Sequence, residues 1–220
     1  MTTPQRNSAG RGLSALRQLA NKVVVGGDES CDLCSVGIGP EHDHLLNPAT
    51  RELRCACRAC AILFSSTGET TYRRVPRDIW NLAEFTLDDG TWAALGIPIG
   101  LAFISRSGIN GGALAVYPSP AGPVQTVLDR EIWEDLAIGN FGPEGMMPDV
   151  EALLINRVNG AREYFIVPID ECYKLTGIVR MHWRGFSGGD AAWERIHVFF
   201  DNLKSRSVAP GNRFHAGSIV

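Results

Sequence analysis

The chain has 220 residues, of which 45% are hydrophobic and 20% charged, a composition typical of a folded globular protein rather than a disordered one. This length suits one or two domains whose cores need neither disulfides nor a metal. The net charge of −3 argues against nucleic acid as a partner, no apolar run reaches the roughly 18 residues of a membrane span, and the N-terminus lacks the features of a signal peptide. We therefore expect a cytoplasmic protein.

Residues 1–29 are predicted to form a flexible N-terminal segment, because they begin with Thr, Pro, Asn, Ser and Gly. Within this segment Leu13, Leu16 and Leu19 recur at helical spacing among basic residues. A short amphipathic helix that docks on a partner is therefore the alternative.

Five of the six cysteines lie between residues 31 and 60. Cys31 and Cys34 form one C-x-x-C pair, and Cys57 and Cys60 form a second. A tight turn brings both sulfurs of such a pair to one side, so two pairs complete a tetrahedral four-sulfur site. In a reducing compartment, clustered cysteines are more often metal ligands than disulfides. The sequence therefore predicts a metal site at these four residues, with zinc as the metal.

Residues 30–66 are predicted to fold around this site as a zinc-finger module. Residues 44–46 and 51–55 have the character of two short strands, and residues 47–50 supply turn chemistry between them. A short helix is expected from residue 57, since residues 57–64 contain neither Gly nor Pro. A knuckle, a hairpin and a ligand pair at a helix N-terminus follow the order of a treble-clef or zinc-ribbon finger, which this segment resembles. The positive end of the helix favours thiolates there.

Three further residues of this module have open roles. Cys55 either replaces Cys57 as a ligand or is buried beside the site as a neighbour of the ligands. His42 and His44 flank the first strand, where they reach the site, donate a hydrogen bond to a ligand, or remain surface imidazoles.

Iron is the alternative metal. Four thiolates from two C-x-x-C pairs also describe a rubredoxin-like iron centre for electron transfer, and five cysteines suffice for an iron–sulfur cluster. Rubredoxin knuckles usually carry glycine after the second cysteine, whereas Ser35 and Ala61 occupy those places here. Together with the helical second pair, this difference favours zinc.

Residues 67–206 are predicted to form an α+β domain with an antiparallel sheet covered on one face by C-terminal helices. Strands are expected at 101–105 and 113–117, with Pro118 breaking the second. A clearer hairpin joins 150–157 to 162–167 through a type I′ turn at Asn159-Gly160.

Four helices are expected in this domain. The first is a short apolar segment capped by Thr86, and the second covers residues 128–136. The third runs from a cap at Asp170 to Trp183, and the fourth begins at Asp190. Residues 207–220 are rich in Ser, Gly, Asn and Arg and are predicted to be a disordered tail.

The α+β domain offers weak candidates for chemistry. Cys172 and His182 lie ten residues apart on one predicted helix, so Cys172 is expected to be a core thiol rather than a nucleophile. Arg180 and Arg184 flank a glycine-rich connection between helices and form a candidate surface for a partner or an anion. The alternatives are an ordinary inter-helix corner and, with less support, the pocket of an enzyme.

Several segments together resemble a mainly actinobacterial family whose members are often encoded beside NiFe-hydrogenase structural and maturation genes. The segments are CDLC (31–34), HDHLLNPATRELRCACRACAILF (42–64), AVYPSPAG (115–122), VPIDECYKL (167–175) and HWRGFSGG (182–189). The likeness spans roughly residues 30–205. It implies a non-enzymatic accessory protein that contacts a hydrogenase subunit or a maturation factor, and it carries over the four paired cysteines, with Cys55 as an additional candidate.

Overall fold

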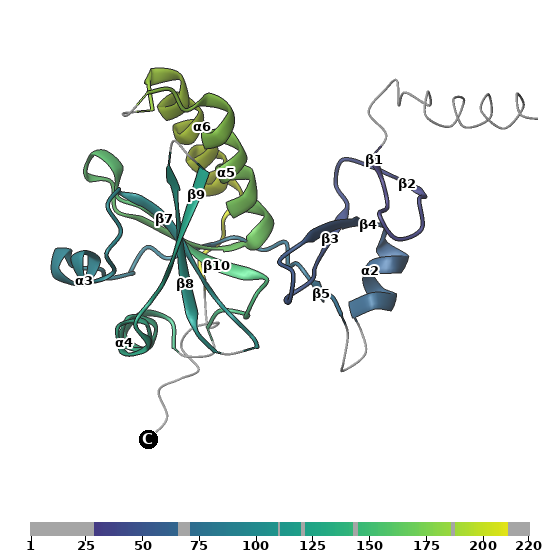
Figure 1. Ribbon diagram of the computed structural model, residues 1–220, viewed down its shortest axis with the longest axis horizontal. Helices are drawn as coiled ribbons and strands as arrows, with labels where there is room; N and C mark the ends of the chain where they lie inside the picture. The colour runs from purple at the N-terminus through teal and green to yellow at the C-terminus, as the bar shows by residue number, and fades with distance from the viewer. Residues whose placement is uncertain are drawn as a thin grey trace, which may run out of the picture.

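The computed structural model describes residues 29–65, 71–109, 111–119, 122–142, 145–185 and 188–210 (Figure 1). The amphipathic helix considered for the N-terminal segment lies outside these ranges, as do residues 211–220 of the expected tail. None of the helices within the described ranges combines the length and apolar character that crossing a bilayer requires.

A six-stranded antiparallel sheet forms the centre of the larger part of the molecule, where the sequence predicted an antiparallel sheet (Figure 1). Its strands run in the order β6-β11-β10-β7-β8-β9, and every neighbouring pair is antiparallel. In chain order the strands are β6 (Trp80–Asn81), β7 (Leu101–Arg106), β8 (Ala113–Ser119), β9 (Gly122–Val127), β10 (Glu151–Asn156) and β11 (Glu163–Pro168).

The Asn-Gly pair forms the turn that the sequence predicted between β10 and β11. The connection is the short 3₁₀ turn η1 (Val158–Gly160), closed by a hydrogen bond from the Ala161 N–H to the Val158 carbonyl. Asn159 and Gly160 have φ values of 53° and 82°. Positive φ at both central residues is what a type I′ turn requires, and Asn and Gly adopt it most readily.

Helices cover both faces of the sheet, whereas the sequence predicted cover on one face (Figure 1). Alternate residues of β7 and β10 point to opposite faces: Phe103 and Leu154 join one buried cluster, and Ile104 and Leu153 the other. The first face packs against α5 (Ile169–His182) and α6 (Asp190–Arg206). The second packs against α4 (Arg130–Asn140) and the segment around α3 (Asp89–Ala94).

The helix expected from Asp190 onward is present, and it carries an apolar stripe. Ile196, Phe199, Phe200 and Leu203 of α6 are buried in the first cluster, and Trp193 packs against its edge. The chain also stays attached beyond residue 206, because Val208 exchanges backbone hydrogen bonds with Ile79 and Asn81 beside β6.

Three expectations about element ends were wrong. Asp88, not Thr86, caps α3, and the Thr86 N–H instead donates to the Asn140 side chain. Pro168 precedes α5, so Asp170 lies in the first turn of the helix rather than at its cap. Pro118 lies inside β8 rather than ending it, since β8 continues to Ser119 and pairs there with β9.

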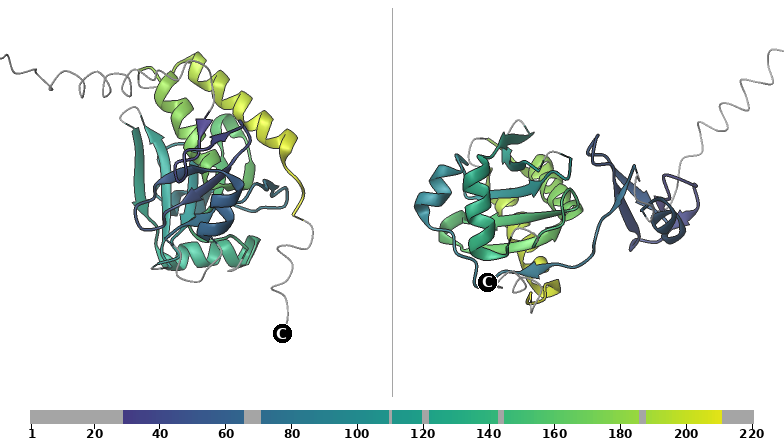
Figure 2. Two further views of the ribbon diagram at one scale, coloured as in Figure 1. Left: turned by 90° about the vertical axis from the view of Figure 1, so that its right-hand side faces the viewer. Right: turned by 90° about the horizontal axis from the view of Figure 1, so that it is seen from below.

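The cysteine-rich N-terminal part, residues 29–74, is called the cysteine module below; residues 66–70 lie outside its described part. It contains a three-stranded sheet in the order β4-β3-β5 and a short hairpin of β1 and β2 (Figure 2). The elements are β1 (Glu29–Ser30), β2 (Gly37–Ile38), β3 (Asp43–Leu46), β4 (Leu53–Ala56), α2 (Arg58–Ser65) and β5 (Arg73–Arg74).

The cysteine module is attached to the six-stranded sheet at the β3–β4 turn. Leu46 is fully buried in the core cluster beneath α5 and α6. Arg51, just after the turn, donates to the Ser105 hydroxyl of β7 at 3.1 Å. The buried carboxylate of Asp149 ion-pairs with both Arg51 and Arg73 of the module.

Candidate metal centre

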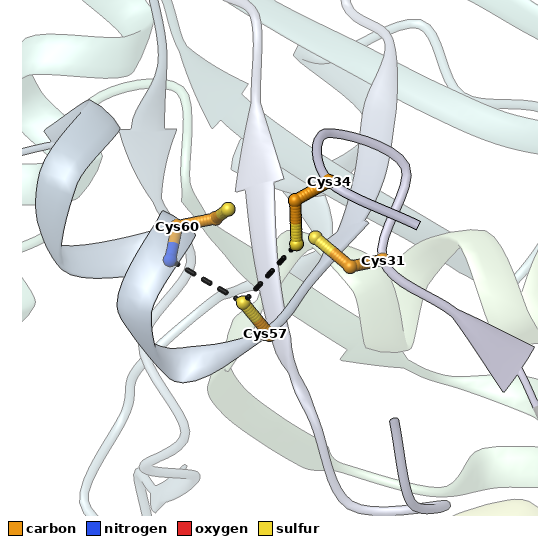
Figure 3. Close-up of side chains that lie close together, drawn as sticks. All are labelled: Cys31, Cys34, Cys57 and Cys60. Carbon is orange, nitrogen blue, oxygen red and sulfur yellow. Dashed lines mark hydrogen bonds between the residues drawn. The ribbon is translucent and has the colours of Figure 1, made fainter. Parts of the chain in front are cut away.

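Four cysteine sulfurs converge between the β1–β2 turn and the start of α2 (Figure 3). Cys31 and Cys34 lie on the turn between β1 and β2, whereas Cys57 directly precedes α2 and Cys60 lies in its first turn. The four Sγ atoms all lie within 4.8 Å of one another. The arrangement could hold a metal ion, and it unites both C-x-x-C pairs.

The first pair lies on a tight knuckle. The Cys31 N–H donates to the Val36 carbonyl and the Ser35 N–H donates to the Cys31 carbonyl, each at 2.8 Å. Ser35 has a φ of 61°, the left-handed conformation that glycine usually supplies. The knuckle therefore forms with a serine at the position where rubredoxin knuckles usually have glycine.

The spacing of the sulfurs fits a tetrahedral ion. Metal–sulfur bonds of about 2.3 Å at tetrahedral angles place sulfurs about 3.8 Å apart. The Sγ atoms of Cys34 and Cys57 are separated by 3.8 Å. The backbone N–H of Cys60 donates to the Cys57 sulfur at 3.5 Å, which stabilises negative charge on that sulfur at the start of α2 (Figure 3).

The local environment affects the four thiols unequally. Burial works to raise the pKa of Cys31, but hydrogen bonds from backbone N–H groups, that of Cys57 foremost, outweigh it and lower the pKa to about 6. Burial, followed by the neighbouring thiols, raises the pKa of Cys60 to about 12. Repulsion between neighbouring thiolates favours keeping a proton on the last sulfurs. A cation bound among the sulfurs would offset this repulsion and favour their deprotonation.

Cys55, His42 and His44 form a separate group. Cys55 lies on β4 directly opposite His44 on β3. One potential ligand atom from each of the three residues lies within 4.8 Å of the other two, and none of the three belongs to the four-cysteine group. His44 donates from Nδ1 to the Asp170 carboxylate of α5 at 2.8 Å. The sequence offered no signal for this contact, because the partners are 126 residues apart.

Arg180 and Arg184 lie far along the chain from the cysteines and are both exposed. Arg184 forms an isolated β-bridge with Gly188, and Trp183 contacts Trp193 edge-on, so the glycine-rich segment forms a packed corner between α5 and α6. Cys172 is fully buried in the sheet core, and its burial raises the pKa of the thiol well above the usual value. The prediction of a core thiol is confirmed.

These features define the chain as a mixed α+β protein with a four-cysteine cluster that could hold a metal ion. The chain belongs to the family of unknown function DUF5947, whose sequence profile matches residues 30–207. The search of curated proteins and the search of solved structures each found no match.

Proposed function

We propose that this protein is a non-enzymatic, metal-binding accessory protein in which Cys31, Cys34, Cys57 and Cys60 hold one zinc ion. The observation that carries the proposal is the convergence of four sulfurs from a knuckle and a helix N-terminus within 4.8 Å of one another. Four thiolates fill the coordination sphere of zinc and leave no position for water or substrate. The metal would therefore fix the fold of residues 30–66 beside a second unit, residues 67–206, whose first strand, β5, completes the three-stranded sheet of the cysteine module.

The helical second pair favours zinc over iron. Ala61 lies in α2 with its N–H bonded to the Cys57 carbonyl, so Cys57 and Cys60 open a helix as in a treble-clef finger. A rubredoxin-like iron site for electron transfer is the second candidate. It is favoured by the φ of 61° at Ser35, which supplies the first of the two knuckles that such a site uses.

The proposed partner is a protein, namely a NiFe-hydrogenase subunit or one of its maturation factors in the cytoplasm. This part of the proposal rests on the family resemblance carried by the segments quoted above. The proposed contact surface includes Arg180 and Arg184, because both side chains are exposed at the corner between α5 and α6. Guanidinium groups at such a corner suit carboxylates of a partner.

Elemental analysis with a visible spectrum tests the metal assignment, using protein purified without oxygen. We expect zinc in the four-cysteine site and no colour. Cys34→Ser should release this zinc, whereas Cys172→Ala, which removes a thiol remote from the cluster, should retain it. Iron with thiolate-to-metal absorption would replace the zinc proposal by the electron-transfer one.

A binding assay with purified hydrogenase subunits and maturation factors tests the partner. The double variant Arg180→Glu/Arg184→Glu should bind at least tenfold more weakly than the parent protein. Arg130→Glu, which reverses an exposed arginine on α4, is the matched control and should bind normally. Equal binding by the double variant and the control would exclude this corner as the contact surface.

A further inference from the structure

His42, His44 and Cys55 meet beside the four-cysteine cluster without sharing a residue with it. His42 and His44 flank Asp43 on β3, and Cys55 pairs with His44 across the hairpin. The two imidazole rings contact each other edge-on, with centroids 4.8 Å apart. The strand register therefore brings two imidazoles and a thiol, which are the ligands that late transition metals prefer, to one place.

Hydrogen bonds fix the protonation of both rings at Nδ1. His42 Nδ1 lies 2.9 Å from the Gly39 carbonyl and 3.2 Å from a Glu29 carboxylate oxygen. His44 Nδ1 lies 2.8 Å from the Asp170 carboxylate. All of these partners only accept hydrogen bonds, so each Nδ1 carries a proton, and Nε2 is the ring nitrogen left to bind a cation.

The Nε2 atom of His42 is buried without a hydrogen-bond partner. The side chain as a whole is only 8% exposed. Leaving a buried nitrogen lone pair unsatisfied costs free energy, and native proteins rarely tolerate it without a reason. A bound cation would supply that reason, because the neutral imidazole nitrogen is a common metal ligand.

We propose that His42, His44 and Cys55 form a second metal site, which takes a late first-row divalent cation such as Zn²⁺ or Co²⁺. A histidine that binds a metal through one ring nitrogen usually donates a hydrogen bond from the other to a carbonyl or a carboxylate, and both histidines make such a hydrogen bond here. Ideal nitrogen–sulfur edges of a tetrahedral site are about 3.6 Å, so ligand atoms at the 4.8 Å limit of their separation would move together by about 1 Å when an ion binds.

The surrounding charge favours a cation. Besides Glu29 and Asp170, the Asp32 carboxylate lies at the site, where it accepts the backbone N–H of Cys55 at 2.7 Å. The basic side chains nearby bind other carboxylates: Arg74 and Arg77 pair with Asp43, and Lys174 and Arg206 pair with Glu171. The charged groups in direct contact with the three candidate ligands are therefore carboxylates: Glu29 with His42, Asp170 with His44, and Asp32 with the Cys55 N–H.

Three protein ligands leave one position of a tetrahedral ion open. The four-thiolate site has no such position, so the two sites differ in kind. His42 and His44 border a cleft of about 250 Å³ between the cysteine module and α5. Water or a small ligand could approach the second ion from this cleft, as in zinc sites that exchange ligands.

Cobalt titration of the full-length, metal-free protein under reducing, anaerobic conditions tests the second site. We expect two equivalents of Co²⁺ to bind, one with the intense charge-transfer absorption of four thiolates and one with the weaker absorption of a single thiolate. His42→Gln and Cys55→Ser should each bind one equivalent and keep the four-thiolate spectrum. That retained spectrum also reports that the variant module is folded. His197→Gln, which changes an exposed histidine on α6, should bind two.

Asp170→Asn provides a second, milder test. Asp170 is a positioning residue, since it holds the His44 ring rather than the ion. Its replacement should weaken Co²⁺ binding at the second site about tenfold, the lower end of the effect expected for such partners, with the four-thiolate site unchanged.

The outcomes separate this inference from the proposed function. A single equivalent with a four-thiolate spectrum in the parent protein would refute the second site and leave the first intact. Loss of the four-thiolate spectrum in Cys55→Ser would place Cys55 in the first site and also overturn the inference. Binding at the second site alone would instead refute the four-cysteine proposal.

Discussion

Removing the metal should unfold the cysteine module while the six-stranded sheet stays folded. The buried cluster around the four cysteines consists of Cys31, Leu45, Ala56, Cys60 and Ala61. Apart from the cysteines, it contains one leucine and two alanines. Their burial contributes about 4 kcal/mol, at about 0.8 kcal/mol per CH₂ and 1.5–3 kcal/mol for a leucine. A structural zinc contributes about 10–16 kcal/mol of folding free energy in small fingers, so the metal should stabilise this module more than its apolar contacts do.

Attachment to the sheet limits how far this unfolding spreads. Leu46 is held in the large core beneath α5 and α6, so the β3–β4 turn should resist longer than α2 and the knuckle. The six-stranded sheet has its own two buried clusters, which contain none of the four cysteines.

Hydrogen exchange of the full-length protein, with and without a chelator, measures this difference. Amides of Ser35 and Ala61 should lose more than about 100-fold of their protection, whereas amides of Leu153 in β10 should keep theirs. Equal protection of α2 with and without metal would refute the structural role of the ion. Loss of protection in β10 would refute the independence of the sheet.

Three further predictions concern the shared core, a buried ion pair and a helix cap. Leu46→Ala should lower the free energy of unfolding, measured in urea, by about 2–5 kcal/mol. A loss below about 1 kcal/mol would mean that the cysteine module does not share the core beneath α5 and α6. Asp149→Asn keeps the backbone conformation but removes the charge that faces Arg51 and Arg73, and it should lower the free energy of unfolding by about 2 kcal/mol. An unchanged free energy of unfolding would show that these ion pairs contribute nothing. Hydrogen bonds from the Thr91 hydroxyl and N–H hold the pKa of Asp88 below its usual value, so this carboxylate stabilises the protein above about pH 4 and loses that effect as the pH falls through its folded pKa. Thr91→Val should raise the Asp88 pKa in an NMR titration, and an unaltered value would contradict the assignment.

The features that the sequence predicted correctly are those set by neighbouring residues. The hairpin at Asn159-Gly160 follows from residues that favour positive φ, and α2 follows from a segment without Gly or Pro. The convergence of the two C-x-x-C pairs depends on little more than one hairpin between them. Each of these patterns lies within a short stretch of sequence.

The features that the sequence missed depend on contacts between distant segments. Asp170 has the residue type of a helix cap, yet its carboxylate binds His44, 126 residues away. The role of Cys55 was open because it depends on strand register, which places the residue opposite His44. Cover of the second sheet face escaped prediction because α4 and the segment around α3 contribute only short apolar stretches, whose destination the local pattern does not specify.

The pairing of Val208 beside β6 has a consequence for solubility. β6 is an edge strand of the six-stranded sheet, and the backbone of Val208 forms hydrogen bonds with Ile79 and Asn81 there. A chain cut after Arg206 would expose these backbone groups at the margin of the sheet. Uncovered strand edges pair with other chains, so the truncated protein should self-associate with increasing concentration. We therefore expect the short segment after α6 to keep this edge of the sheet from pairing with other chains.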